Sequence, residues 1–180
     1  MRTNPALLSL CLTFALPGYS ACASADETFN ALLGAIEQRL DLARSVARHK
    51  WHHDLPVQAS EREHQILAQV RSAAPAYNLS PERAEAFFSD QIEASKLVQY
   101  ALLDRWAVLG PHSKAPTPAG DLRPRLDKLQ ASLLLELGRL DPQRLTNCPA
   151  TLAKALASRT IDPLRHLALI RATGQLCNRI

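Results

Sequence analysis

The segment Arg48–Asp54, with the sequence RHKWHHD, places three histidines within five residues, and imidazole groups are common metal ligands. His49 and His53 are four residues apart, so they share one face if the segment is helical. A zinc site needs three or four ligands, whereas this pair supplies two and lacks the glutamate of an H-E-x-x-H motif. Histidines also suit the C-terminal end of a helix, where cations interact favourably with the helix dipole. We therefore expect no metal here, and Lys50, which lies among the histidines, is the stronger candidate for chemistry.

Two cations lie on what should be an apolar helix face. Arg39 and Lys50 are eleven residues apart, so their directions on a helix agree to within about 20°. They share this face with Ile36, Ala43 and Val46, which should point toward the core. The simpler interpretation is that each side chain buries its alkyl stem and leaves its charge in water. The alternative is that both charges point inward.

Two hydrogen-bonding side chains repeat this anomaly further along the chain. Ser95 and Gln99 are four residues apart and lie on the apolar stripe of Phe88, Ile92 and Leu102. A structural interpretation is available, because a core serine can bond to a carbonyl one turn back and a buried glutamine can fix helix register. The other interpretation is that both residues face a ligand.

A further cation and an acid, Arg62 and Glu63, fall in the first turn of a helix that begins near Ser60. The simpler interpretation is a capping box between Ser60 and Glu63, with Arg62 in water. If Arg62 instead joins Arg39 and Lys50 in one interior, these buried charges need a partner. The missing partner would be a small anion with about two carboxylates, held by forked and point-charge contacts.

The helices that must position these residues follow from composition and apolar spacing. The chain has 180 residues, of which 47% are hydrophobic, which suits one globular domain. Glycine is scarce, and leucine and alanine recur every three or four residues without alternating β-branched runs, so we expect an all-α fold. A connector with three prolines lies at residues 110–120. The predicted helices cover residues 26–53, 60–73, 80–110, 122–140, 149–158 and 163–178.

The N-terminus is expected to be a secretory signal. Met1-Arg2 precedes an apolar run, and Ala23-Ser24-Ala25 forms an A-x-A cleavage pattern, so residues 1–25 would be removed and residues 26–180 would form the mature domain. Cys22 leaves lipoprotein processing as an alternative. The mature chain would be periplasmic or secreted, and free of the membrane once the signal is removed.

The charges of the mature chain argue against one class of partner, and its cysteines indicate a disulfide. Removal of Arg2 leaves 20 basic and 17 acidic residues, interspersed without a basic run, so we expect no nucleic-acid partner. Cys148 and Cys177 are the two cysteines outside the signal, and such a pair in an exported protein most often forms a disulfide.

At these positions the sequence resembles the all-helical chorismate mutases, and within them the secreted gamma subclass. The bacterial pattern is an arginine on a long first helix, a lysine eleven residues later, and an arginine twelve beyond it that glutamate usually follows. A Ser or Thr comes thirty-three residues later, with Gln or Glu one turn on. This sequence matches the pattern without a gap at Arg39, Lys50, Arg62, Glu63, Ser95 and Gln99. Phrases such as FFSDQIEASKLVQY extend the resemblance over about residues 29–106.

The sequence departs from the family at two places. The family often has aspartate three residues before the second-helix arginine, whereas this chain has Ala59, which leaves only a backbone amide to meet the substrate hydroxyl. The subclass can also supply an arginine from the fourth helix, where a rough alignment places Ser132. Arg125 and Arg139 lie seven residues to either side, and neither is assigned this role.

The resemblance implies conversion of chorismate to prephenate by a unimolecular Claisen rearrangement, with no covalent intermediate, metal or cofactor. Lys50 and Gln99 would donate hydrogen bonds to the ether oxygen, on which charge develops. The implied substrate-binding residues are Arg39, Arg62, Glu63 and Ser95. Among them, Arg39 would hold a carboxylate with help from Ser95, Arg62 would add positive potential, and Glu63 would accept from the ring hydroxyl.

Two other functions stay open on the sequence. Isochorismate pyruvate lyase shares the helical fold and the cationic pocket, and product analysis with chorismate and isochorismate separates the two activities. A non-catalytic exported helical protein that binds a dicarboxylate or a partner is the other, and ligand binding without turnover would favour it. Whether the domain forms a homodimer is likewise open.

Overall fold

The computed structural model describes residues 25–110, 119–141, 147–159 and 162–178, and within these ranges it contains helices and no strands. The all-α prediction is therefore confirmed. The predicted signal lies outside these ranges except for its last residue, and so does most of the proline-rich connector. No helix in the described ranges is long and apolar enough to cross a membrane. The helices are α1 (Ala25–His52), α2 (Ser60–Ala73), the 3₁₀ helix η1 (Ala74–Tyr77), α3 (Pro81–Leu109), α4 (Ala119–Leu140), α5 (Cys148–Ala157) and α6 (Pro163–Ala172).

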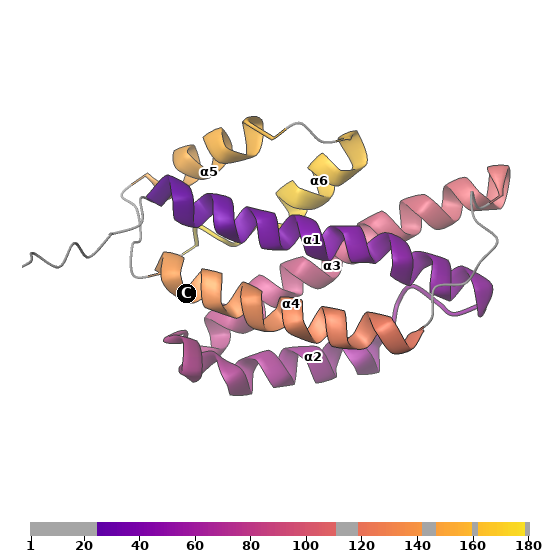
Figure 1. The fold of residues 1–180 in the computed structure, drawn as a ribbon, viewed down its shortest axis with the longest axis horizontal. Coiled ribbons are helices and arrows are strands. Elements are labelled where there is room, and N and C mark those ends of the chain that lie inside the picture. Colours follow the sequence, from indigo (N-terminus) through magenta and orange to yellow (C-terminus); the bar gives the residue numbers. More distant parts are fainter. Residues whose placement is uncertain (1–24, 111–118, 142–146, 160–161, 179–180) are drawn as a thin grey trace, which may run out of the picture.

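Helix α1 is the centre of the arrangement, with α5 and α6 on one side and α4 on the other (Figure 1). Helix α3 packs against α1, α2 and α6, and so connects α2 to the C-terminal helix α6. Apolar residues three and four apart on α1 are fully buried, which is the pattern of a helix that faces a core. The largest apolar side chains that are fully buried in the core are Phe29, Leu32, Leu33, Ile36, Phe87, Phe88, Leu133, Leu134, Leu137 and Leu169.

Two of the helices begin with a side-chain cap. The Ser80 hydroxyl oxygen accepts a hydrogen bond from the Arg83 backbone N–H at 3.1 Å, and Asp162 Oδ1 accepts one from the Arg165 N–H at 3.1 Å. A proline follows each cap, at the helix position where its missing N–H is not needed. These caps fix where α3 and α6 begin.

The capping of α2 differs from the prediction, although the helix begins at Ser60 as expected. Its N-cap is Ala59, and Ser60 is already helical, so the Ser60 hydroxyl does not cap the helix. The other half of the predicted capping box is present, because Glu63 Oε1 accepts from the Ala59 N–H at 3.0 Å. The sequence had suggested that the Ala59 amide meets the substrate hydroxyl. Glu63 instead accepts the hydrogen bond of this amide, so the amide is not available to a substrate.

The last helix is shorter than predicted, because α6 ends at Ala172 and turns replace it over residues 173–177. Side chains from α3 satisfy the backbone of these turns. The buried Arg83 guanidinium donates to the carbonyls of Gln175 at 3.0 Å and Leu176 at 2.5 Å, and Asp90 Oδ2 accepts from the Gln175 N–H at 2.7 Å. The chain end is thus held to α3 by polar contacts that sequence periodicity does not reveal.

The predicted disulfide between Cys148 and Cys177 is present, with the two Cα atoms 5.6 Å apart. It joins the start of α5 to the turns that follow α6, across 29 residues of sequence. On the chain-entropy estimate, closing a loop of this size stabilises the fold by about 3 kcal/mol. The bond restrains the C-terminal part of the chain, which contributes no residue to the cavity described next.

Candidate active site

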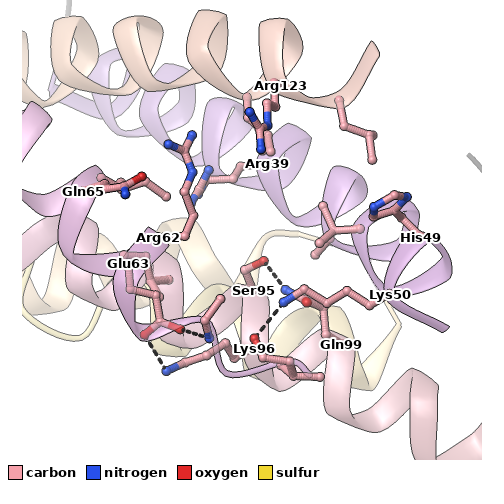
Figure 2. A pocket seen from close by; sticks show the side chains of 18 of the residues that line it. Arg39, His49, Lys50, Arg62, Glu63, Gln65, Ser95, Lys96, Gln99 and Arg123 are labelled. Atoms are coloured by element: carbon pink, nitrogen blue, oxygen red, sulfur yellow. Dashed lines mark hydrogen bonds and ion pairs between the residues drawn. The ribbon is translucent and has the colours of Figure 1, made fainter. Parts of the chain in front are cut away.

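A cavity of about 630 Å³ opens between α1, α2, α3 and α4. Each of these helices contributes side chains to its wall, so the cavity depends on the packing of all four (Figure 2). The structure brings together in this wall all six site residues predicted from the sequence, which are Arg39, Lys50, Arg62, Glu63, Ser95 and Gln99.

Arg39 is the most buried charge in the cavity wall, with 8% of its surface exposed. Its Nε atom is buried without a hydrogen-bond partner, and no acid among the described residues forms an ion pair with it. Burial lowers the pKa of Arg39 to about 10, which shows how strongly the site disfavours the bare cation. A guanidinium in this position needs an anion that the described protein does not supply.

Lys50 reaches the cavity from the last turn of α1. Its ammonium Nζ donates to the carbonyl of Val57 at 2.7 Å, which ties the end of α1 to the segment before α2. An ammonium has three N–H groups, so two remain for a ligand. Burial lowers the pKa of Lys50, the nearby charge of Glu63 raises it, and that of Lys96 lowers it, with a net decrease. Lys50 is thus a half-buried donor at the cavity wall.

Ser95 and Gln99 face the cavity from α3 and contact each other. Gln99 Nε2 donates to the Ser95 hydroxyl oxygen at 3.0 Å. The Gln99 amide is 96% buried, and its Oε1 atom has no hydrogen-bond partner. One amide N–H and the serine hydroxyl proton remain for a ligand.

Three arginines line the cavity from three different helices. Figure 2 shows Arg39 of α1, Arg62 of α2 and Arg123 of α4 gathered on one side, away from Lys50 and Gln99. Arg123 was not predicted from the sequence. Three guanidinium groups on one side make this the part of the cavity best suited to a carboxylate.

The three α4 positions considered on the sequence, Ser132, Arg125 and Arg139, lie outside the cavity. Ser132 donates its hydroxyl to the Lys128 carbonyl at 3.1 Å, and Arg139 pairs with Glu136 at 2.8 Å. The sequence did not fix the register of α4, because the connector before it has no periodicity from which to count. A basic residue in the first two turns of α4 was the signal that could have found Arg123.

Lys96 is the second wall residue that sequence reasoning missed. Its ammonium contacts Glu63 Oε2 at 3.2 Å, Gln58 Oε1 at 3.0 Å and Glu93 Oε1 at 2.6 Å. The side chain is 11% exposed. Lys96 is adjacent to Ser95 and so does not share its helix face, and helical spacing therefore does not point to it. The signal that could have found Lys96 is the need of Glu63 for a cation to pair with.

The histidines at the end of α1 are not arranged as a metal site. His49 lines the cavity and stacks against His53, with ring centroids 4.4 Å apart. In the described part of the chain, no three His, Cys, Asp or Glu side chains cluster closely enough to hold a metal ion. From this segment, His49 and Lys50 are the residues that line the cavity.

Comparison with known proteins identifies the family. The model of the chorismate mutase type II family matches residues 23–100. The secreted chorismate mutase of Mycobacterium tuberculosis is 31% identical to this chain over 157 residues, which cover 83% of this chain and 78% of that protein. The chain belongs to the chorismate mutase family. It is therefore an isomerase, and its family implies chorismate as the substrate.

Solved chorismate mutases share the whole fold. The structure from Burkholderia phymatum superposes with a TM-score of 0.80 at 37% identity and covers 87% of this chain and 100% of that one. The chorismate mutase from Burkholderia thailandensis gives a TM-score of 0.78 at 37% identity, covering 83% of this chain and 99% of that one. The likeness thus extends past the residues matched by the family model.

Proposed function

We propose that the cavity between α1 and α4 binds chorismate and converts it to prephenate, and that Lys50 and Gln99 are its catalytic residues. The observation that carries this proposal is the buried Arg39 guanidinium, which has no ion-pair partner among the described residues and lies beside Arg62 and Arg123. A dicarboxylate supplies the missing negative charge. At the other side of the cavity, Gln99 is an uncharged hydrogen-bond donor and Lys50 a cationic one, and the ether oxygen of chorismate would lie there.

The reaction requires no covalent bond between the protein and the substrate. In the Claisen rearrangement the ether C–O bond breaks while a C–C bond forms, and no proton leaves or enters the substrate. The protein must hold the reactive diaxial conformer and stabilise the charge that develops on the ether oxygen. Lys50 and Gln99 each have an unused N–H at the cavity, so they supply these donors.

The substrate is oriented by the charges at the other end of the cavity. Arg39, with Ser95 assisting, binds one carboxylate, and Arg62 and Arg123 add hydrogen bonds and positive potential for the carboxylates. Glu63 accepts a hydrogen bond from the ring hydroxyl. Because this end holds three guanidinium groups and the other holds Lys50 and Gln99, the substrate has one preferred direction.

The experiment that tests the activity is to add chorismate and, in a separate assay, isochorismate to the purified protein, follow the disappearance of each compound and identify the products. Prephenate is expected from chorismate. Pyruvate with a hydroxybenzoate, formed from isochorismate, would indicate the lyase of the same fold. Binding of a dicarboxylate without turnover would instead support a non-catalytic binding protein and overturn the proposal.

We also propose export, because residues 1–25 have the pattern of a secretory signal and the M. tuberculosis relative is named a secreted enzyme. The mature protein would lie in the periplasm or the medium. The N-terminal sequence of the protein recovered from these fractions is expected to begin at Asp26. A chain retained in the cytoplasm with Met1 intact would contradict this.

The identity of Gln99 predicts the pH dependence of activity. A glutamine amide donates without being protonated, so we expect the wild-type kcat/KM to vary little between about pH 5 and 8. A carboxyl group must be protonated to donate, so Gln99→Glu is expected to work mainly in acid. Its kcat/KM should fall about tenfold for each pH unit above the pKa of the introduced carboxyl.

The control for this variant is Gln69→Glu, which adds the same charge at an exposed position on α2 outside the cavity. It is expected to keep the flat wild-type profile. A flat profile in Gln99→Glu as well would show that residue 99 does not donate to the ether oxygen.

A further inference from the structure

The ammonium of Lys96 is enclosed by three acceptors from three parts of the chain. Glu63 Oε2 lies 3.2 Å away on α2, Gln58 Oε1 lies 3.0 Å away in the segment before α2, and Glu93 Oε1 lies 2.6 Å away on α3. An ammonium has three N–H groups, so these contacts use all of them. Lys96 lines the cavity, yet it has no donor left for a ligand.

The carboxylate of Glu63 is held from both sides. Its Oε1 accepts from the Ala59 N–H at 3.0 Å, and its Oε2 accepts from Lys96 and from Gln58 Nε2 at 3.1 Å. Lys96 also fixes the Gln58 amide, since it takes Oε1 and so turns Nε2 toward Glu63. A carboxylate has about four acceptor sites, so one remains free at the cavity.

Without Lys96, the Glu63 carboxylate could form an ion pair with other cations nearby. The charged groups that face it are Lys96 from α3 and Lys50 from α1, and Arg62 is its neighbour on α2. Figure 2 shows Glu63 beside Lys96, with Lys50 on the far side of the cavity. If the carboxylate turned to Lys50, it would neutralise the cation that must donate to the ether oxygen.

We propose that Lys96 is a positioning residue, which fixes the Glu63 carboxylate for the ring hydroxyl of the substrate and keeps it from pairing with Lys50. This inference rests on the proposed function of the cavity. Lys96 touches no reacting atom, so its effect must pass through Glu63.

The titration of the pair agrees with this geometry. Burial raises the pKa of Glu63, but the Ala59 amide and Lys96 more than offset it, so the pKa lies below its usual value. Burial lowers the pKa of Lys96, but Glu93 and Glu63 more than offset it, so that pKa lies above its usual value. The ion pair thus persists as the pH falls until it reaches the lowered pKa of Glu63. Without Lys96, Glu63 should take up its proton at higher pH.

The test compares Lys96→Met, which keeps the side-chain length, with Lys96→Arg, which keeps the charge. Each is made in the wild type and in a Glu63→Gln background. Lys96→Met is expected to lower kcat/KM about tenfold at pH 7, the effect of one charge-assisted hydrogen bond, and to move the acid limb of its pH profile upward. Lys96→Arg should restore most of the activity. In the Glu63→Gln background, Lys96→Met should lower kcat/KM by less than about twofold, because the Glu63 carboxylate through which Lys96 acts is absent.

The control is Arg105→Met, which removes an exposed cation from the same helix outside the cavity and is expected to change nothing. Thermal melting of each variant verifies that it is folded. An equal loss from Lys96→Met in both backgrounds, or an Arg variant as damaged as the Met variant, overturns the inference.

A second readout separates this inference from the proposed function. The pKa of the Glu63 carboxyl is measured by carbon NMR titration of the ligand-free protein, and it should rise in Lys96→Met and stay unchanged in Arg105→Met. An unchanged pKa in Lys96→Met overturns the role of Lys96 whatever the activity. A raised pKa in a protein that leaves chorismate intact would remove the proposed function and keep the coupling of Lys96 to Glu63.

Discussion

Replacing Lys50 with alanine is expected to lower kcat/KM for chorismate by about 10²–10³-fold, the usual cost of removing one donor to a developing oxyanion. The substrate carboxylates are still held by the arginines at the other end of the cavity, so the loss should fall mainly on kcat. Charge on the ether oxygen develops only in the transition state, and a donor to it therefore acts there. The measurement is steady-state kinetics at neutral pH.

The variant must be shown to stay folded, because Lys50 also donates to the Val57 carbonyl. Loss of that bond should lower the free energy of unfolding by only about 1 kcal/mol. Lys154→Ala, at an exposed position on α5, is the matched control and should keep wild-type kinetics. Near-normal turnover by Lys50→Ala would remove Lys50 from the mechanism.

The part of the site that could be predicted from the sequence lies within single helices. Arg39 and Lys50 share one face of α1, and Ser95 and Gln99 share one face of α3, because helical geometry fixes relative direction over several turns. The fold class followed from the same regularity. The family spacing then linked these helices to Arg62, which no periodicity connects to them.

The residues that were missed depend on how helices pack on one another. Arg123 lies beyond a connector without periodicity, so its register relative to α3 could not be counted. Lys96 faces the cavity only because Glu63 and Gln58 are brought against it by the start of α2. The capping of that helix was also mispredicted, since Ala59 and not Ser60 is the N-cap, although the helix begins at Ser60 as predicted. Tertiary contacts of this kind are not encoded in local spacing.

Replacing Arg39 with methionine is expected to change activity and stability in opposite directions. The variant should lose about 10²–10³-fold in kcat/KM, because a buried guanidinium that holds a carboxylate is gone. The ligand-free protein should gain roughly 1–3 kcal/mol in free energy of unfolding, because an unpaired buried cation is replaced by an apolar side chain. The sign follows from the lowered pKa of Arg39, about 10 in the folded state. A cation with a lowered pKa destabilises the fold at every pH below that value, and the penalty falls only as the pH rises above it.

Steady-state kinetics measures the loss of activity, and urea denaturation at pH 7, with and without added prephenate, measures stability and ligand binding. The product should stabilise the wild type by RT ln(1 + [L]/Kd) and leave Arg39→Met nearly unchanged, so the order of stability reverses at high ligand concentration. Arg44→Met removes an exposed cation from the same helix and should alter neither stability nor ligand response. A variant that is less stable than the wild type without ligand would mean that the protein itself satisfies Arg39. The buried charge would then cease to argue for a bound dicarboxylate, and the cavity would have to be explained without one.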